Sequence, residues 1–172
     1  MKAKSAKAKG SKLERRVAEE YRKIGIEAKR MPLSGAFSHL KSDIFKPTPD
    51  GWHDECKNQE TVKLRDWWLQ TTGTCGRSIP VLHISANYRP VITVVSSDQW
   101  YQMLKELKDI GSGYLHHTKK IAKKRFNLWD EWNAVKNETE YGDPVLHIEH
   151  MDLTVISLEH YMEIREVLNE MD

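Results

Sequence analysis

Three ionisable side chains whose spacing could serve phosphodiester chemistry lie in the segment from Ser42 to Lys57. Asp43 precedes a short apolar run, a turn rich in proline and glycine follows, and the next run contains Glu55 and Lys57. Because side chains alternate faces along a strand, Glu55 and Lys57 point the same way, and an antiparallel hairpin would place Asp43 beside them. Two carboxylates and one ammonium group would then share a small patch.

This patch has two interpretations. Two carboxylates close together repel each other unless a cation joins them, and carboxylate oxygens are ligands that suit Mg²⁺ or Mn²⁺. A bound ion would lower the pKa of a water molecule and stabilise charge on a phosphate, while Lys57 would orient that water or neutralise the charge. The alternative is a hairpin held by ordinary salt bridges, since 30% of the residues are charged and Glu-x-Lys also arises by chance.

The elements that would position these residues follow from apolar periodicity and turn signals. Residues 1–10 are a Lys/Ala-rich segment interpreted as a basic flexible arm, and a helix is predicted from Ser11 to Ile24 with a capping box of Ser11 and Glu14. The order α-β-β-β-α-β-β-α through residue 110 predicts an α/β fold, with a mixed central β-sheet flanked by helices. The later predicted elements are strands at 26–31, 42–45, 52–57, 80–85 and 91–95, and helices at 64–75 and 98–109.

The C-terminal part repeats part of what precedes it. The sequence P-V-L-H-I occurs at residues 80–84 and again at residues 144–148, and L-R-D-W-W near residue 64 returns as L-W-D-E-W at residue 128. Residues 114–172 are therefore predicted to hold a degenerate α-β-β-α repeat packed on a core formed by residues 11–110. At the positions equivalent to Glu55 and Lys57 the copy has Lys119 and Ile121, so it lacks the acid and the lysine.

Charge is distributed unevenly along the chain. Residues 1–30 have eleven Lys/Arg against four acids, residues 31–129 have fourteen against nine, and residues 130–172 have two against twelve. The basic front favours a polyanionic partner such as nucleic acid. The run at 119–125 is predicted to be helical, and either DNA contact or plain solvation would suit the four lysines on one side of it, which are Lys119, Lys120, Lys123 and Lys124.

Several classes of protein are disfavoured by the sequence. The sequence contains no apolar run of about 18 residues, so no membrane span is predicted. The basic N-terminus lacks the apolar segment of a secretory signal. The two cysteines, Cys56 and Cys75, lack metal-site spacing and indicate reduced thiols in a cytoplasm-like compartment. No glycine-rich phosphate loop is present, so no nucleotide cofactor is expected.

Short motifs in a fixed order narrow the choice. The motifs are K-G-S-K-L-E-R at 9–15, R-M-P-L-S-G at 30–35, S-D-I at 42–44 and E-C-K at 55–57. Together they resemble the archaeal Holliday-junction resolvase family and its phage relatives, members of the PD-(D/E)xK nuclease superfamily. The resemblance covers residues 9 to about 100, and it implies that residues 11–110 are a nuclease core. Ser42 stands where the family usually has proline, which leaves Asp43 in register.

The resemblance implies roles for particular residues. Metal ions would be bound by Glu14, Asp43, Glu55 and the backbone carbonyl of Cys56. The catalytic set would also include Lys57, Ser34 and Gln70. DNA phosphates would be held by Lys9, Arg15 and Arg30. Structural alternatives remain open, such as a capping acid at Glu14, a simple turn at Ser34 and a solvated helix face at Arg15.

The resemblance also implies a function. It implies a Mg²⁺-dependent endonuclease, with Mn²⁺ as the alternative ion, that resolves four-way DNA junctions in recombination and repair by paired hydrolytic nicks leaving 5′-phosphates. Paired nicks need two active sites, so a homodimer on branched DNA is expected. A phage origin, in the host cytoplasm, would fit. The alternatives are a related nuclease that cuts flap, single-stranded or duplex DNA, and a non-catalytic DNA-binding protein.

Overall fold

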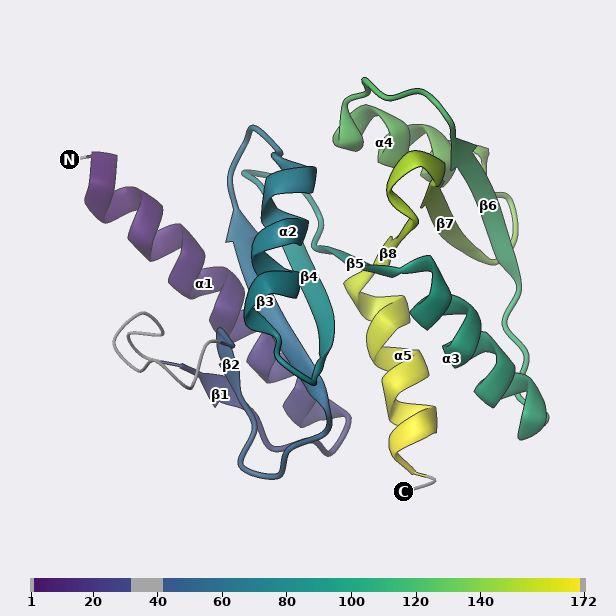
Figure 1. The fold of residues 1–172 in the computed structure, drawn as a ribbon, viewed down its shortest axis with the longest axis horizontal. Coiled ribbons are helices and arrows are strands. Elements are labelled where there is room, and N and C mark those ends of the chain that lie inside the picture. The colour runs from purple at the N-terminus through teal and green to yellow at the C-terminus, as the bar shows by residue number, and fades with distance from the viewer. Residues whose placement is uncertain (1, 32–41, 171–172) are drawn as a thin grey trace. The chain divides into compact units, whose positions relative to one another are not determined.

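The computed structural model describes residues 2–31 and 42–170 (Figure 1). The chain divides into two compact units, Met1–Val91 and Ile92–Asp172, which are called here the N-terminal and C-terminal units. The predicted boundary lies after residue 110, whereas residues 92–110 are grouped with the C-terminal unit in the structure.

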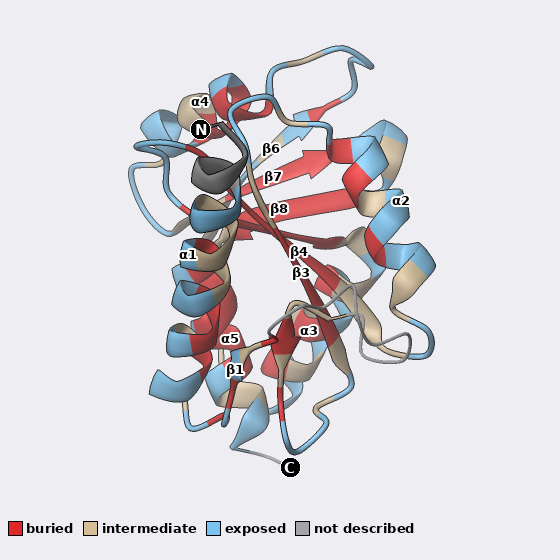
Figure 2. Ribbon diagram, turned by 90° about the vertical axis from the view of Figure 1, so that its left-hand side faces the viewer, coloured by how far each residue is buried: buried red, intermediate tan, exposed pale blue. Residues whose placement is uncertain are grey.

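The N-terminal unit is built around a parallel pair of strands. Its helices are α1 (Lys2–Lys23) and α2 (Leu64–Thr74). Its strands are β1 (Lys29–Arg30), β2 (Ile44–Phe45), β3 (Trp52–Asn58) and β4 (Ile79–Ser85). β3 pairs with β4 in parallel and β1 pairs with β2 antiparallel. Helices α1 and α2 lie on opposite faces of the β3–β4 pair, and most of both strands is buried (Figure 2).

Helix α1 begins at Lys2, so the predicted start at Ser11 is wrong, and residues 2–10 are helical although the sequence suggested a flexible arm. Lysine and alanine both favour helix, and the single Gly10 does not interrupt it. The predicted apolar stripe is confirmed, because Leu13 is 3% exposed and Val17 and Tyr21 are fully buried. Glu14 lies inside the helix and is not a capping acid.

Within residues 92–170, the C-terminal unit has four strands and three α-helices. The strands are β5 (Ile92–Ser96), β6 (His116–Ile121), β7 (Asp143–Ile148) and β8 (Leu153–Ser157). The helices are α3 (Ser97–Asp109), α4 (Leu128–Glu138), the short 3₁₀ helix η1 (Glu149–Met151) and α5 (Leu158–Asn169). β5 pairs antiparallel with β8, β8 antiparallel with β7, and β7 parallel with β6. Helices α3 and α5 pack on β5 and β8 and against each other.

The internal repeat is visible in the order of elements. The series α2-β4-β5-α3 recurs as α4-β7-β8-α5, and the parallel β3–β4 pair recurs as β6–β7. The repeat therefore begins one strand earlier than the sequence suggested. At its centre the equivalent residues Val94 and Val155 lie opposite each other in the β5–β8 pair. Each copy of the repeat thus contributes one strand to the β5–β8 pair, and equivalent residues face each other there as they do at an isologous interface.

The predicted helix at residues 119–125 is wrong. Lys119 and Lys120 lie in β6, where neighbouring side chains point to opposite faces, and Lys123 and Lys124 lie in the loop after it. Pairing with β7 outweighs the local preference of lysine for helix. The four lysines therefore do not form one helical face.

The predicted fold class is confirmed. The chain is a mixed α/β protein with parallel and antiparallel strand pairs and helices packed against them. Among the described residues, no helix combines the length and the apolar character that crossing a bilayer requires.

Candidate active site

Asp43 is attached to the backbone of β3 through both its own backbone and its side chain. Its N–H donates to the carbonyl of Asp54 at 2.8 Å, and the N–H of Cys56 donates to its Oδ2 at 2.8 Å. Ser42 adds to this attachment, because its Oγ accepts from the N–H of Asp54 at 3.1 Å. β2 itself pairs with β1, so the expected hairpin ladder between β2 and β3 is replaced by these contacts just before β2.

A hydrogen-bonded group lies on the α2 side of β3 and consists of Glu55, Lys57 and Gln70. Glu55 Oε1 accepts from Lys57 Nζ at 2.7 Å and from Gln70 Nε2 at 3.0 Å. The side chains of Glu55 and Lys57 are 7% and 17% exposed, so water screens this ion pair only in part. The structure thus brings the predicted helix glutamine to the predicted metal-binding glutamate.

Glu14 lies on α1, where it contacts Arg30 of β1. The Arg30 guanidinium of β1 donates from Nε to Glu14 Oε2. The end of β3 is tied to α1 by Asn58, whose Nδ2 donates to the carbonyl of Lys9 at 3.2 Å. Arg15 is exposed on the same helix. Two of the three residues expected to hold phosphates, Lys9 and Arg15, therefore lie on one helix, and the third contacts Glu14.

The carboxyl group of Asp43 is the most perturbed acid of the site. Burial raises its pKa to about 7, and the nearby carboxylates of Glu55 and Glu14 contribute in the same direction. The Cys56 N–H and the Lys57 ammonium lower it but do not compensate. Because Asp43 holds its proton near neutrality through burial, with a further contribution from the nearby carboxylates, a bound cation would favour its ionised form.

A buried network next to the site was not anticipated from the sequence. Asp54 Oδ1 accepts from the Tyr21 hydroxyl at 2.7 Å and lies 2.9 Å from His83 Nε2, and Oδ2 accepts from Lys46 Nζ at 2.7 Å. Burial alone would raise the pKa of Asp54, but Lys46 and His83 hold it well below its usual range. This network fixes β3 against α1 and so fixes the strand that carries Glu55.

The donor set suits a hard divalent cation, because it consists of carboxylate oxygens. Two of these carboxylates nevertheless have other partners: Glu14 accepts from Arg30, and Glu55 accepts from Lys57 and Gln70. Within residues 2–31 and 42–170, a group of three ligand-type side chains with donor atoms all within 4.8 Å of one another does occur. It lies in the C-terminal unit and does not include Glu14, Asp43 or Glu55. A shared ion would therefore have to replace part of the Arg30 and Lys57 contacts.

Comparison with known proteins identifies the family. Residues 5–141 match the family described as "Phage putative PDDEXK endonuclease", which is well over half of the chain. The chain belongs to this family. No match was found among curated proteins or among solved structures.

The family match places the chain in the PD-(D/E)xK superfamily, as the ordered motifs predicted, and it is a family of endonucleases. Nucleases of this superfamily typically use divalent metal ions. The matched range contains Glu14, Asp43, Glu55 and Lys57. The family description does not mention four-way junctions.

The remaining predicted site residues are Ser34 and the four lysines of residues 119–124. Ser34 lies outside the described residues. Lys119 pairs with Glu138 at 3.3 Å, and Lys123 pairs with Glu131. Lys120 and Lys124 are exposed. DNA contact by any of the four lysines stays a prediction.

Proposed function

We propose that the protein is a divalent-metal-dependent endonuclease that hydrolyses phosphodiester bonds in branched DNA, with the four-way junction as its preferred substrate. The observation that supports this is the partly buried group of Asp43, Glu55 and Lys57, which is joined through β3 and lies within the range of the PD-(D/E)xK family match. The preference for junctions is supported by the ordered motifs alone.

In this proposal each residue has a defined task. Asp43 and Glu55 would hold Mg²⁺ or Mn²⁺, with Glu14 and the carbonyl of Cys56 as further ligands. The bound ion would supply Lewis acidity and a more acidic water molecule. Lys57 would place its ammonium where negative charge develops on the phosphate, and Gln70 would fix the orientation of Glu55.

The basic residues of α1 support a polyanionic substrate. Lys7, Lys12 and Arg15 are exposed, and they belong to the helix that also carries Glu14. Lysine and arginine contacts to phosphates give affinity without sequence preference. Such contacts suit an enzyme that recognises the shape of DNA, and they would place the phosphate backbone near α1.

Comparing substrates tests the preference for junctions. A four-way junction, a flap and a linear duplex of matched sequence are incubated with Mg²⁺, and each strand is labelled in turn. The proposal expects paired nicks in two junction strands of like polarity, with 5′-phosphate ends. Equal cleavage of duplex or flap would favour the more general nuclease, and binding without cleavage of any substrate would favour the DNA-binding alternative.

Paired nicks also require two active sites, and we propose a homodimer on the junction. One surface is already used, because the edge of β5 pairs with β8 of the same chain. A second copy would therefore bind elsewhere. Sedimentation should show a dimer with junction DNA, and a monomer both with and without DNA would overturn this part of the proposal.

A further inference from the structure

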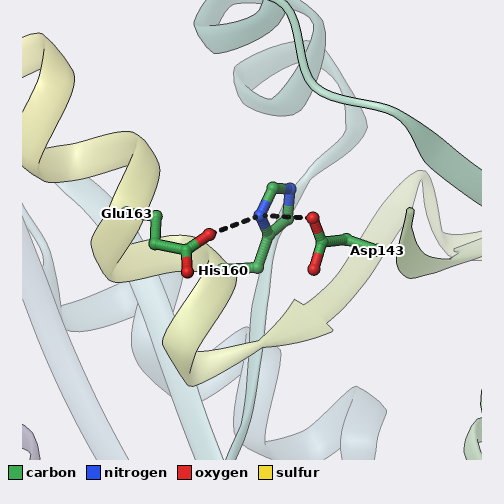
Figure 3. Close-up of side chains that lie close together, drawn as sticks. All are labelled: Asp143, His160 and Glu163. Atoms are coloured by element: carbon green, nitrogen blue, oxygen red, sulfur yellow. Dashed lines mark hydrogen bonds and ion pairs between the residues drawn. The ribbon is translucent and has the colours of Figure 1, made fainter. Parts of the chain in front are cut away.

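A different group of ligand-type side chains lies in the C-terminal unit. His160 Nδ1 is 3.2 Å from Asp143 Oδ2 and 3.5 Å from Glu163 Oε2, and the three donor atoms all lie within 4.8 Å of one another. Figure 3 shows the two carboxylates on either side of the imidazole, Asp143 from the start of β7 and Glu163 from the second turn of α5. His160 comes from the first turn of α5.

The spacing of these atoms fits a small divalent ion. Zinc binds imidazole nitrogen and carboxylate oxygen at about 2.0–2.2 Å, so ligand atoms at the corners of a tetrahedron lie about 3.3 Å apart. The two distances from His160 Nδ1, 3.2 and 3.5 Å, are close to that value. A nitrogen ligand with two oxygens suits zinc or a similar transition metal better than Mg²⁺, which binds mainly oxygen.

The imidazole is held in one orientation by the residues around it. His160 is 1% exposed, and its Nε2 lies 3.0 Å from Nε2 of His116 in β6. The rings of Trp100 and Tyr114 pack edge-on against it. When Nε2 of His160 donates to His116, the lone pair of Nδ1 is directed at the two carboxylates. A ligand histidine in a metal site is oriented by an outer partner in this way.

The backbone that carries Asp143 is also fixed. The N–H of Asp143 donates to the carbonyl of Leu115 at 2.8 Å, which places Asp143 beside His116 in the β6–β7 register. Gly142 permits this approach, because its φ is +83° and a Cβ there would lie 2.2 Å from the Leu115 oxygen. On the other element, Ser157 caps α5 by accepting from the N–H of His160 at 3.0 Å.

The group is specific to the second copy of the repeat. Asp143 begins β7 as Ile79 begins β4, and His160 and Glu163 are the third and sixth residues of α5, where α3 has Gln99 and Gln102. The first copy therefore has no ligand at any of the three positions. These residues are not an inherited part of the fold, which favours a separate role.

We propose that Asp143, His160 and Glu163 bind one zinc ion or a similar divalent transition metal, with His116 as the outer partner of His160. The side chains of Asp143 and Glu163 are 38% and 58% exposed, so the ion has access from solvent and water can complete its coordination. The ion joins the first turns of α5 to the start of β7. It stabilises the C-terminal unit without taking part in the nuclease chemistry.

Zinc binding is measured on the full chain with the other candidate site disabled. The parent is the Asp43→Asn/Glu55→Gln double variant, titrated with Zn²⁺ by calorimetry and with Co²⁺ by visible absorption. The parent is expected to bind one ion and to unfold at higher temperature with zinc. Glu163→Gln and Asp143→Asn should each weaken binding by more than about tenfold, and His116→Gln by about 10- to 100-fold.

The matched control is Glu170→Gln, an exposed acid beyond the end of α5, which should bind zinc as the parent does. Because Glu163 and Asp143 reach solvent, their variants are expected to fold, and far-ultraviolet circular dichroism checks this. The proposal is overturned if the parent shows no saturable zinc binding, or if Glu163→Gln and Asp143→Asn bind zinc as tightly as the parent. Neither result depends on nuclease activity.

Discussion

Asp43 determines how the candidate active site responds to pH. Its pKa is raised to about 7, above the ordinary value of 3.8, so the folded protein keeps a proton that the unfolded chain loses between those values. The contribution of this group to stability is therefore full at low pH and is lost as the pH rises through about 7. The charged form of Asp43, which would bind metal in the proposed function, is the form that destabilises the metal-free protein.

The first prediction concerns the Asp43→Asn variant. Without metal at pH 8, the variant should be more stable than the wild type, by on the order of 1–3 kcal/mol, because it removes an unfavourable buried charge while keeping an acceptor for the Cys56 N–H. Urea unfolding at pH 5 and pH 8 with a chelator present measures this. An unchanged difference between the two pH values would contradict the assigned electrostatics.

The second prediction concerns the buried carboxylate of Asp54. Asp54→Asn should destabilise the protein by about 3–5 kcal/mol, because it leaves the Lys46 ammonium without its buried partner. Asp50→Asn is the control, since Asp50 also contacts Lys46 but its side chain is 13% exposed and Asp54 would remain. Similar losses in the two variants, measured by urea unfolding, would show that the network is not centred on Asp54.

The same network has an acid limit. The pKa of Asp54 is held below its ordinary value, so its stabilising contribution is present above that ordinary value, near pH 4, and is lost as the pH falls further.

The sequence indicated Asp43, Glu55 and Lys57 because motif order and strand alternation specify them. The sequence did not indicate Asp54, because only the structure shows that Tyr21, Lys46 and His83 surround this acid and stabilise its buried charge.

At the scale of elements, strands and helices with strong patterns were predicted to within a few residues. Residues 52–57, 80–85 and 98–109 correspond to β3, β4 and α3. The start of α1 and the strand β6 were missed. In the first case lysine and alanine were assigned to a flexible arm although both favour helix, and in the second pairing with β7 outweighed a lysine-rich pattern.

The third prediction concerns the turn before β7. Gly142→Ala should destabilise the protein by more than about 2 kcal/mol, because the residue has a positive φ and its Cβ would meet the Leu115 carbonyl. Gly113→Ala is the matched control, since a Cβ there meets nothing within 4 Å and no positive φ is required. Thermal unfolding of both variants compares them, and equal stability would contradict the close approach.

At the scale of the whole molecule, the repeat is joined by its own central strands. β5 from the first copy pairs with β8 from the second, and α3 packs against α5. The sequence revealed the repeat through P-V-L-H-I, but it could not show that β5 of the first copy pairs with β8 of the second. For that reason the predicted boundary near residue 111 separates elements that pack together within the C-terminal unit.

The fourth prediction is that a fragment ending at residue 110 will not fold as an independent nuclease. It would leave the edge of β5 and the buried face of α3 without β8 and α5. We expect loss of cooperative unfolding or aggregation, measured by circular dichroism and light scattering. A fragment that unfolds cooperatively and cleaves DNA would show that the C-terminal repeat is dispensable.

The most direct test of the account is cleavage of a four-way junction by the wild type, Asp43→Asn and Lys57→Met, with Mg²⁺ and with a chelator. Glu170→Gln, which lies outside the site, is the control. We expect cleavage by the wild type and the control with Mg²⁺ only, and rates at least about 100-fold lower for the two site variants. Undiminished cleavage by Asp43→Asn and Lys57→Met, or cleavage in the chelator, would contradict it.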